Sequence, residues 1–584
     1  MPPPLVSFLA AARALLPKIV LVTEQDANHN GASFRKRFAE ALGYDGDLYD
    51  SLDAAAAAYR RPAAERAEVE RAVLGEEIRG ALLHEGAHPA RTARPAAAVG
   101  DAHGAGRVPE QKLLKLRPPE HYLNIPRVMY RPSVQDQGTV DQAQLVPALY
   151  ECAAHVIEGS FEKTDISLSQ IKSLSSIVDG PLQRLSLIFA DSLARRLLCP
   201  IQGFAGALIH PSDYFEQSSL QSARCSFTDL SPYIHTGFVT INRAILEAME
   251  VEKVVHIIDL SCSTSHPRQW LKLLHDFHRR QGGPPEVRLT VVNDDNDFLA
   301  NMQMLLSNEA DKLKIPFQFK SVIGRLETLD FSNLRDTLEI KYGEAIAISC
   351  SLQMHRLLLA DDSATCSGIG QLQKMASIAQ LKQMASSVYS PVSTLSPQCQ
   401  TPKLLTSFLN AVRGLKPNIM LLMEQDANHN ALLFCDRFME ALNYYAALFD
   451  SFHAVAAANP RKADERARVE RMILGEEIKN ILVCEGVHRH ERHERLSQWA
   501  MHMDRSGFEH VPLSFHAIWE GKTKLMSFGL DERQGKVEND CLLLCWGSTH
   551  LYSISAWRPY KGSTSGSRDH MLVQPQRQII GPNN

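Results

Sequence analysis

Acidic residues follow two apolar runs that are typical of buried strands. Asp259 ends the first run, and the second is followed by three acids: Asp294, Asp295 and Asp297. Acids at the carboxyl ends of parallel strands can hold the ribose hydroxyls of a nucleotide or of S-adenosylmethionine. Such a site also needs glycines in its first turn, so that backbone can approach the ligand, but the turn Leu260–Pro267 contains none. We therefore expect Asp259 to accept hydrogen bonds from its own loop, and the later acids to cap the next helix.

The segment His488–Glu494 reads His-Arg-His-Glu-Arg-His-Glu and so contains metal-ligating side chains. His490 and Glu494 would lie one turn apart on a helix, but no two of its histidines have i,i+4 spacing with a third ligand nearby. Alternating charges are instead typical of a solvated helix face, which is the structure that we expect here. The sequence thus predicts no metal site, and it predicts no bound cofactor.

No group of residues indicates nucleophilic catalysis. Cys262 and Cys350 lack a neighbouring base, and such cysteines are more often buried packing residues. We also expect four indole side chains to pack in the core or between elements: Trp499, Trp519, Trp546 and Trp557. The sequence therefore predicts a protein that is not an enzyme.

The charge balance excludes a strong general attraction to nucleic acids or anionic membranes. Lysine and arginine total 62 against 66 acids, a net charge of −4. The longest apolar runs, such as Cys541–Trp546, are far shorter than the ~20 residues of a membrane span. Eleven scattered cysteines favour a reducing compartment. Short basic clusters leave room only for weak or assisted DNA contact: Arg195–Arg196, Arg279–Arg280, and a face with Arg489, Arg492 and Arg495.

The spacing of apolar residues predicts the elements that must position these side chains. Between residues 145 and 198 the spacing is helical, whereas from residue 254 short apolar runs alternate with helical segments. The runs predict parallel strands at 254–258, 287–292, 317–323, 345–349 and 419–423. Helices are predicted at 267–280, 298–313, 432–456 and 463–484. Two final strands, 541–546 and 551–557, are joined by the turn Gly547–His550.

This alternation predicts an α/β fold with a doubly wound sheet, of the methyltransferase-like Rossmann type that is parallel and ends in an antiparallel hairpin. An α-helical cap at about 140–250 precedes the Rossmann-like core at about 251–563. Within that core, residues 361–402 are rich in Ser, Gln and Thr, which predicts a loop insertion with a short helix near 369–384. We expect residues 96–139 to be a linker and residues 564–584 a flexible tail.

The beginning of the chain repeats a later part of it. Residues 5–88 align with residues 405–488 without a gap, and 48 of the 84 positions are identical. We therefore interpret residues 1–95 as a partial duplicate of residues 401–495. A fused fragment of a tandem gene copy is favoured over a functional module, because the fragment lacks the neighbouring strands that would bury its own strand.

Short motifs in a fixed order carry a resemblance to a known family. The first is Val255-His256-Ile257-Ile258-Asp259, which lies between leucine-rich helical segments. The later ones are Arg466-Ala-Arg-Val469-Glu470, the pair Glu476 and Glu477, Trp499, Trp546, and Ser555-Ala556-Trp557. In this order they resemble the plant GRAS family of transcriptional regulators, whose VHIID and SAW segments they match. The resemblance spans about residues 140–560 and is closest to the scarecrow-like protein three subgroup.

The resemblance implies a nuclear transcriptional co-regulator that acts through protein–protein interactions in gibberellin and developmental signalling. Its implied partners are DELLA-type members of the family and zinc-finger proteins of the indeterminate-domain class, and a homo- or heterodimer is consistent with it. Two alternatives stay open. One is a transcription factor that binds specific DNA sequences directly, and the lower one is a methyltransferase-like enzyme that uses S-adenosylmethionine.

The helical cap is where we expect partners to bind. Leu168, Ile171 and Leu174 recur at helical spacing in the leucine-rich segment before the VHIID motif. An exposed apolar face of this kind can receive a partner helix, whereas a buried one belongs to the core. These three residues are therefore a candidate partner surface. They can serve as one only if their side chains are exposed in the structure.

Overall fold

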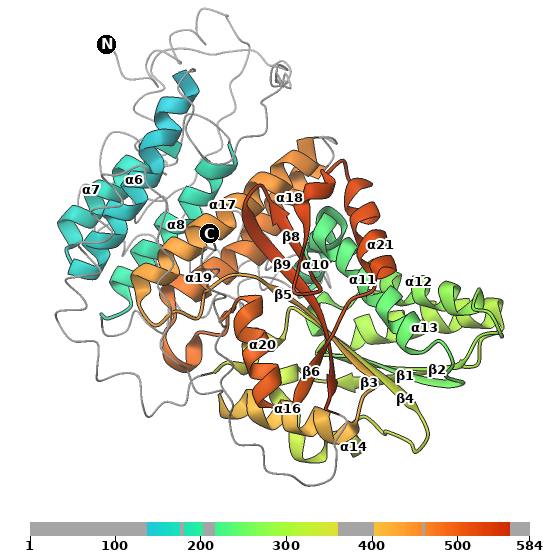
Figure 1. The fold of residues 1–584 in the computed structure, drawn as a ribbon. Helices are drawn as coiled ribbons and strands as arrows, with labels where there is room; N and C mark the ends of the chain where they lie inside the picture. The colour runs from blue at the N-terminus through green and yellow to red at the C-terminus, as the bar shows by residue number, and fades with distance from the viewer. Residues whose placement is uncertain (1–136, 176–179, 202–216, 360–401, 458–461, 561–584) are drawn as a thin grey trace, which may run out of the picture. The chain divides into compact units, whose positions relative to one another are not determined.

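The computed structural model describes residues 137–175, 180–201, 217–359, 402–457 and 462–560 (Figure 1). The chain divides into two units, Met1–Pro126 and Arg127–Asn584, and the described residues all belong to the second. The predicted duplicate at 1–95, the short helix near 369–384 and the tail at 564–584 lie outside the described residues. So does the predicted linker at 96–139, except for its last three residues, which begin the first described helix.

A nine-stranded sheet forms the centre of the second unit, in the order β3-β2-β1-β4-β5-β9-β8-β7, with β6 paired to β9. Five strands are parallel: β1 (Val254–Asp259), β2 (Glu286–Asn293), β3 (Phe317–Ile323), β4 (Ala345–Ser351) and β5 (Ile419–Gln425). Four are antiparallel: β6 (Phe508–Val511), β7 (Gly535–Glu538), β8 (Cys541–Trp546) and β9 (Thr549–Pro559). The predicted Rossmann-like sheet with an antiparallel C-terminal hairpin is confirmed.

The central strands are apolar throughout because both faces of the sheet are covered. On β5, Ile419, Leu421 and Met423 pack into one core, whereas Met420 and Leu422 pack into the other. The first core holds α11 (Pro232–Ala248), α12 (Pro267–His278), α13 (Asn296–Leu313), α17 (Phe434–Ala457) and α21 (Phe515–Met526). The second holds α14 (Leu334–Thr337), α16 (Lys403–Leu415) and α20 (Leu496–Arg505), and α14 and α16 lie below the sheet in Figure 1.

The helical cap consists of α6 (Gln137–Glu158), α7 (Phe161–Ser175), α8 (Pro181–Leu198) and α10 (Gln217–Leu230). It joins the core through α17, where the Phe438 ring meets Tyr150 and Phe189 edge to face at 5.8 and 5.6 Å between centroids. A partly buried ion pair adds to this contact, because Arg184 of α8 donates to both carboxylate oxygens of Glu470 at 2.8 and 3.0 Å. Cap and sheet therefore share one hydrophobic core.

Some elements differ from the prediction. The segment predicted as one helix at 463–484 is α18 (Ala463–Val469), a π-helical turn at Glu470–Leu474, and α19 (Gly475–Val483). The hairpin turn between β8 and β9 has two residues rather than four, since Trp546 pairs with Thr549. Gly547 supports this tight turn with a φ of +60°. None of the helices that the structure describes combines the length and the apolarity that a bilayer crossing requires.

The place of β5 in the sheet predicts the effect of removing the N-terminal repeat. Residues 419–425 pair with β4 on one side and β9 on the other, so the sheet has no second position for the similar sequence at 19–25. We expect deletion of residues 1–110 to change the melting temperature of the remaining chain by only a few degrees, measured by circular dichroism. An unfolded deletion variant would show that the repeat supports the fold.

Candidate functional site

Asp259 ends β1 at the carboxyl edge of the parallel sheet and is completely buried. Its carboxylate accepts hydrogen bonds from the Ser261 amide at 2.9 Å, the Ser265 hydroxyl at 2.6 Å and the Trp270 indole at 2.8 Å. Burial raises the pKa of Asp259, and these hydrogen bonds oppose that rise. The interpretation of Asp259 as an acceptor for its own loop is confirmed.

Protein hydrogen bonds also bridge the gap between β1 and β4, where the strand order reverses and such sheets bind ligands. The Leu260 amide donates to Ser349 O at 2.8 Å, and the Thr264 hydroxyl donates to Ser351 O at 2.7 Å. On the other side of β1, the Asn293 amide group donates to Cys262 O at 2.7 Å. The turn after β1 is therefore tied by hydrogen bonds to both neighbouring strands, β4 and β2.

Of the three acids after β2, only Asp295 has the capping role that the sequence predicts. Asp295 is the N-cap of α13 and accepts a hydrogen bond from the Phe298 amide at 3.0 Å. Asp294 pairs with Arg325 at 2.7 Å, and Asp297 lies in the first turn of α13, where an acid interacts favourably with the helix dipole. Cys262 and Cys350 are buried packing residues, as predicted.

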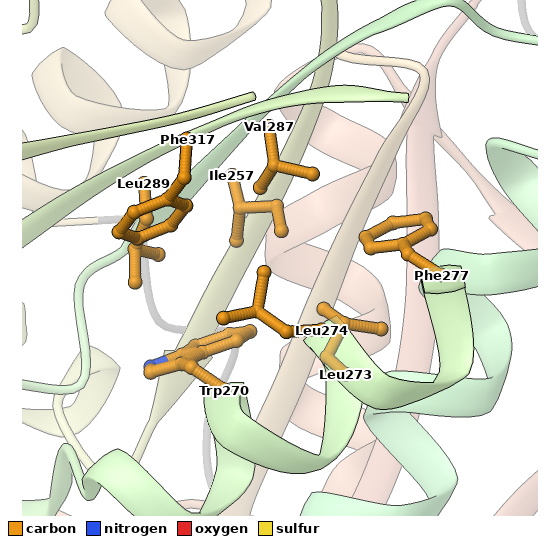
Figure 2. A pocket seen from close by; sticks show the side chains of 8 residues that line it. All are labelled: Ile257, Trp270, Leu273, Leu274, Phe277, Val287, Leu289 and Phe317. Carbon is orange, nitrogen blue, oxygen red and sulfur yellow. The ribbon is translucent and has the colours of Figure 1, made fainter. Parts of the chain in front are cut away.

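A small apolar pocket lies between α12 and the first three strands (Figure 2). Aliphatic and aromatic groups line it, from Ile257 of β1 and Val287 of β2 to Trp270 and Phe277 of α12. The only side-chain nitrogen in this lining is Nε1 of Trp270, which already donates to Asp259. The pocket therefore reflects packing of α12 on the sheet and offers no polar group to orient a ligand.

Glu424, at the end of β5, begins a second buried polar group at this edge of the sheet. Its Oε1 accepts hydrogen bonds from the Gln353 and Met354 amides at 2.9 and 2.7 Å, and its Oε2 lies 3.0 Å from His355 Nδ1. These contacts fix the 3₁₀ turn Met354–Leu357 that follows β4. Glu424 thus accepts hydrogen bonds from the turn after β4, as Asp259 accepts them from the turn after β1.

The segment His488–Glu494 contacts this second group and is not the solvated helix face predicted for it. Its structure is a short 3₁₀ turn, Gly486–His488, followed by an extended stretch. Five of its side chains are nine-tenths or more buried: Arg489, Glu491, Arg492, His493 and Glu494. The prediction failed because the charges alternate to meet buried partners on other elements rather than water.

The segment is held by the residues that follow β5. The His493 carbonyl accepts hydrogen bonds from the His429 and Asn430 amides at 2.9 and 3.2 Å. Glu494 accepts from the Asn430 side chain at 2.7 Å, and Arg489 donates to His429 O at 2.9 Å. The motif Glu-Gln-Asp-Ala-Asn-His-Asn at 424–430 and the segment His488–Glu494 therefore form one polar layer.

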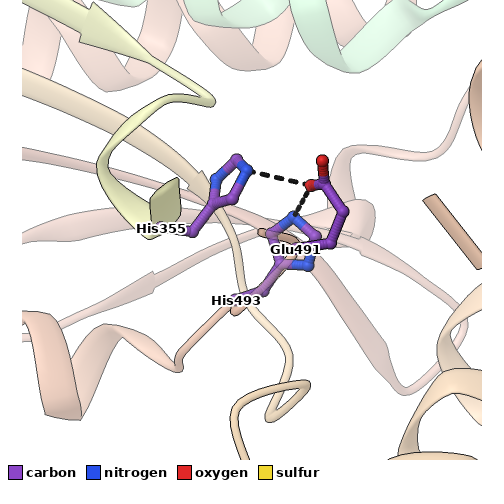
Figure 3. A group of neighbouring side chains, drawn as sticks. All are labelled: His355, Glu491 and His493. Atoms are coloured by element: carbon purple, nitrogen blue, oxygen red, sulfur yellow. Dashed lines mark ion pairs between the residues drawn. The ribbon is translucent and has the colours of Figure 1, made fainter. Parts of the chain in front are cut away.

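Within this layer three side chains approach one another: His355, Glu491 and His493 (Figure 3). Glu491 Oε2 lies 3.0 Å from His355 Nε2 and 3.4 Å from His493 Nε2, and its Oε1 accepts from Arg356 at 2.8 Å. Burial alone would lower the pKa of His355, but Glu491 and Glu424 outweigh burial and raise it to about 9. Burial lowers the pKa of His493 to about 4.

Other motif positions serve the fold. Arg466 contacts His453 at 2.9 Å, Val469 is buried, and Glu476 pairs with Lys479. Glu477 accepts a hydrogen bond from the Tyr445 hydroxyl at 2.9 Å, and burial, aided by Glu491, raises the pKa of Glu477 to about 7.

The aromatic and SAW positions pack or form hydrogen bonds within the domain. Trp499 is buried, and Trp546 donates to Asp450. Trp557, next to buried Ala556, donates to Ser555. Trp519 is 54% exposed, so its predicted packing role is wrong.

The three residues of the candidate partner surface on the cap lie on the inward side of α7. Ile171 is completely buried, and Leu168 and Leu174 pack against the same hydrophobic core. These residues face α6 and α8 because an amphipathic helix turns its apolar stripe inward when neighbouring helices can cover it. Leu168, Ile171 and Leu174 therefore stabilise the cap, and the first and last of them are only partly buried.

Sequence reasoning missed the links between distant segments. His355 and Glu424 lie 69 residues apart, and His355 and Glu491 lie 136 apart, so no local spacing connects them. One signal was available: both His355 and Glu424 follow runs predicted as parallel strands, whose carboxyl ends meet at one edge.

The described residues form a Rossmann-like domain with a helical cap. The sequence pattern of the GRAS domain family matches residues 2–98 and 145–558. The chain therefore belongs to the GRAS domain family.

Relatives in plants agree with this assignment. Scarecrow-like protein 3 of Arabidopsis thaliana is 38% identical over 436 residues, which cover 71% of this chain and 88% of that protein. DELLA protein GAI1 of Vitis vinifera is 29% identical over 440 residues, 74% of this chain and 65% of that protein. The crystal structure of SCL7 in Oryza sativa has a TM-score of 0.55 at 26% identity and covers 71% of this chain and 99% of its own. These similarities are consistent with a plant transcriptional regulator.

His256 of the VHIID motif provides a pH test of its structural role. The side chain is completely buried between Glu344 at 3.0 Å and the Thr290 hydroxyl at 2.8 Å, and burial lowers its pKa to about 4. An unfolded histidine titrates near pH 6.5, so this lowered pKa contributes stability above about pH 6.5 that is lost as the pH falls toward 4. The full contribution is about 3 kcal/mol, from about 1.4 kcal/mol per pKa unit.

We expect the free energy of unfolding to fall between pH 7 and about pH 4.5 in the wild type, and to fall by about 2 kcal/mol less in His256→Asn. Urea titrations at the two pH values measure the difference. Equal losses in the two proteins would mean that His256 is charged in the folded state.

Proposed function

We propose that this protein is a nuclear transcriptional co-regulator that acts through protein–protein contacts in gibberellin-linked and developmental signalling. The observation that carries the proposal is the match to the GRAS family along most of the chain, with 38% identity to Scarecrow-like protein 3. Its proposed partners are DELLA-type members of the family and zinc-finger proteins of the indeterminate-domain class. The similarity to several proteins named as DELLA proteins is compatible with binding between family members.

A role without catalysis is part of this proposal, and the closed sheet edge supports it. The Asp259 carboxylate is occupied by three protein donors, so it is not available to a ribose or an amino group. The turn after β1 has no glycine, and its amides and hydroxyls are directed to neighbouring strands. A methyl donor would have to displace these hydrogen bonds before it could bind.

Calorimetry with S-adenosylmethionine and with NAD tests this part of the proposal. We expect no binding tighter than about 10 µM to the purified chain, because hydrogen bonds of the protein fill the switch point. Binding of either cofactor below that value, abolished by Asp259→Ala in a variant that stays folded, would establish the enzyme alternative instead.

Because the apolar stripe of α7 faces the core, we assign the partner surface to α21. Phe515 and Trp519 lie four residues apart on one face of this helix and are 76% and 54% exposed. Met526 and, on the edge strand β7, Val537 are also exposed. Exposed aromatic side chains of this kind are typical anchors of protein interfaces, where they bury large areas at little entropic cost. The proposed occupant is a DELLA-type family member.

The double variant Phe515→Asp, Trp519→Asp tests this surface. We expect the affinity for a DELLA-type partner, measured by calorimetry or by pull-down from plant nuclei, to fall at least about 10-fold. The melting temperature should change little, because both side chains are more than half exposed. The matched control is Phe161→Asp, Ile166→Asp on α7, at 52% and 62% exposure, which should retain the partner. Equal binding by all three proteins would contradict the assignment.

Direct DNA binding is the second candidate function. The contacts of the basic clusters within the protein argue against it. Arg489 and Arg492 are buried, Arg196 bonds to Glu485 and lies 3.9 Å over the Phe434 ring, and Arg280 donates to backbone carbonyls. Binding of a promoter fragment by the chain alone, with a steep dependence on salt, would favour this alternative.

A further inference from the structure

We propose that His355, Glu491 and His493 form a binding site for one zinc ion. The two imidazoles and the carboxylate come from the turn after β4 and from the buried segment His488–Glu494. Two histidines and one acid are the ligand set of a common class of three-ligand zinc site, in which water takes the fourth position. This inference is independent of the proposed function, because it concerns how the domain is held together.

The spacing of the ligand atoms suits zinc. The two Nε2 atoms lie 3.0 and 3.4 Å from the same oxygen, Glu491 Oε2, and all three ligand atoms lie within 4.8 Å of one another. Zinc bonds of about 2.0–2.1 Å at tetrahedral angles place neighbouring ligand atoms about 3.3 Å apart. The three side chains therefore enclose a point that a zinc ion could occupy with small adjustments.

Both imidazole Nε2 atoms are ion-paired to Glu491 Oε2, but neither forms an aligned hydrogen bond with it. His355 Nε2 and His493 Nε2 are both buried without a hydrogen-bond partner, although both approach Glu491. The 3.0 Å contact of His355 Nε2 is short enough for an ion pair but is not aligned as a hydrogen bond. Buried polar atoms are normally satisfied, and a shared metal ion would satisfy both nitrogens together with the carboxylate.

The outer contacts orient each ligand for this role. His355 Nδ1 lies 3.0 Å from Glu424 Oε2, and His493 Nδ1 lies 2.9 Å from His429 Nδ1. A proton on each ligand's Nδ1 leaves a lone pair on Nε2, which is the arrangement found around metal-bound histidines. Arg356 holds the other oxygen of Glu491, so Oε2 is left for the metal.

The site would connect segments that no short loop joins. His355 follows β4, whereas Glu491 and His493 lie between α19 and α20, and the shell around them includes Glu424 at the end of β5. The N-terminal repeat has Arg91 and Ala93 at the positions that correspond to Glu491 and His493. One ion per chain is therefore expected at this buried position.

Metal titration of the full chain tests the site. The protein is stripped with a chelator, dialysed and titrated with zinc against a chromophoric competitor, and with cobalt to record visible absorption. We expect one equivalent of zinc, a higher melting temperature with zinc than without, and a four-coordinate cobalt spectrum. Glu491→Gln and His493→Gln should each weaken zinc binding at least about 100-fold, and Glu424→Gln should weaken it about 10- to 100-fold.

His502→Gln is the matched control, because His502 is an equally buried histidine that pairs with Glu494 at 2.8 Å outside the three-residue cluster. This variant should keep one equivalent of zinc. The proposal is overturned if the wild type binds no zinc and gives no four-coordinate cobalt spectrum, since the cluster is then an ion-paired network with a protonated His355. It is also overturned if Glu491→Gln and His493→Gln bind zinc as the wild type does. Should these variants not fold, the wild-type cobalt spectrum decides alone.

Discussion

The structure depends on two buried acids at the carboxyl edge of the parallel sheet. Asp259 and Glu424 end β1 and β5, and a buried carboxylate without hydrogen bonds or a positive partner is strongly destabilising. Asp259 accepts hydrogen bonds from the turn after β1 and from the indole of Trp270 on α12. Glu424 accepts one from the turn after β4 and contacts His355. These contacts tie the turns after β1 and β4 to the edge of the sheet, so the same constraint shapes the fold and supports our proposal of a function through the surface.

Periodicity and turn chemistry predicted most of the sheet from the sequence. The five parallel strands and the closing hairpin follow from apolar runs that both faces of a covered sheet require, and β3 and β8 have the predicted bounds. The missing glycines after β1 also predicted the role of Asp259. Short or edge elements such as β6 and β7 were not predicted, because four-residue strands leave no clear alternation.

The parts that failed depend on contacts between distant segments. Leu168, Ile171 and Leu174 have the spacing of any amphipathic helix, and only the packing of α6 and α8 shows that this stripe faces inward. The alternating charges of His488–Glu494 suggest exposure until their partners at 424–430 and His355 are known. A local pattern shows the periodicity of a segment, but it does not show which distant residues carry the charges that pair with it. The polar layer could therefore be recognised only in the three-dimensional structure.

We propose that this Rossmann-like domain works through contacts with other proteins rather than through a bound organic cofactor. Native mass spectrometry of the intact chain, purified from plant nuclei under non-denaturing conditions, tests it most directly. We expect complexes whose excess mass is that of a partner protein, with no additional mass of a nucleotide or methyl donor on the free chain. A free chain that carries the mass of S-adenosylmethionine or of a dinucleotide would contradict it.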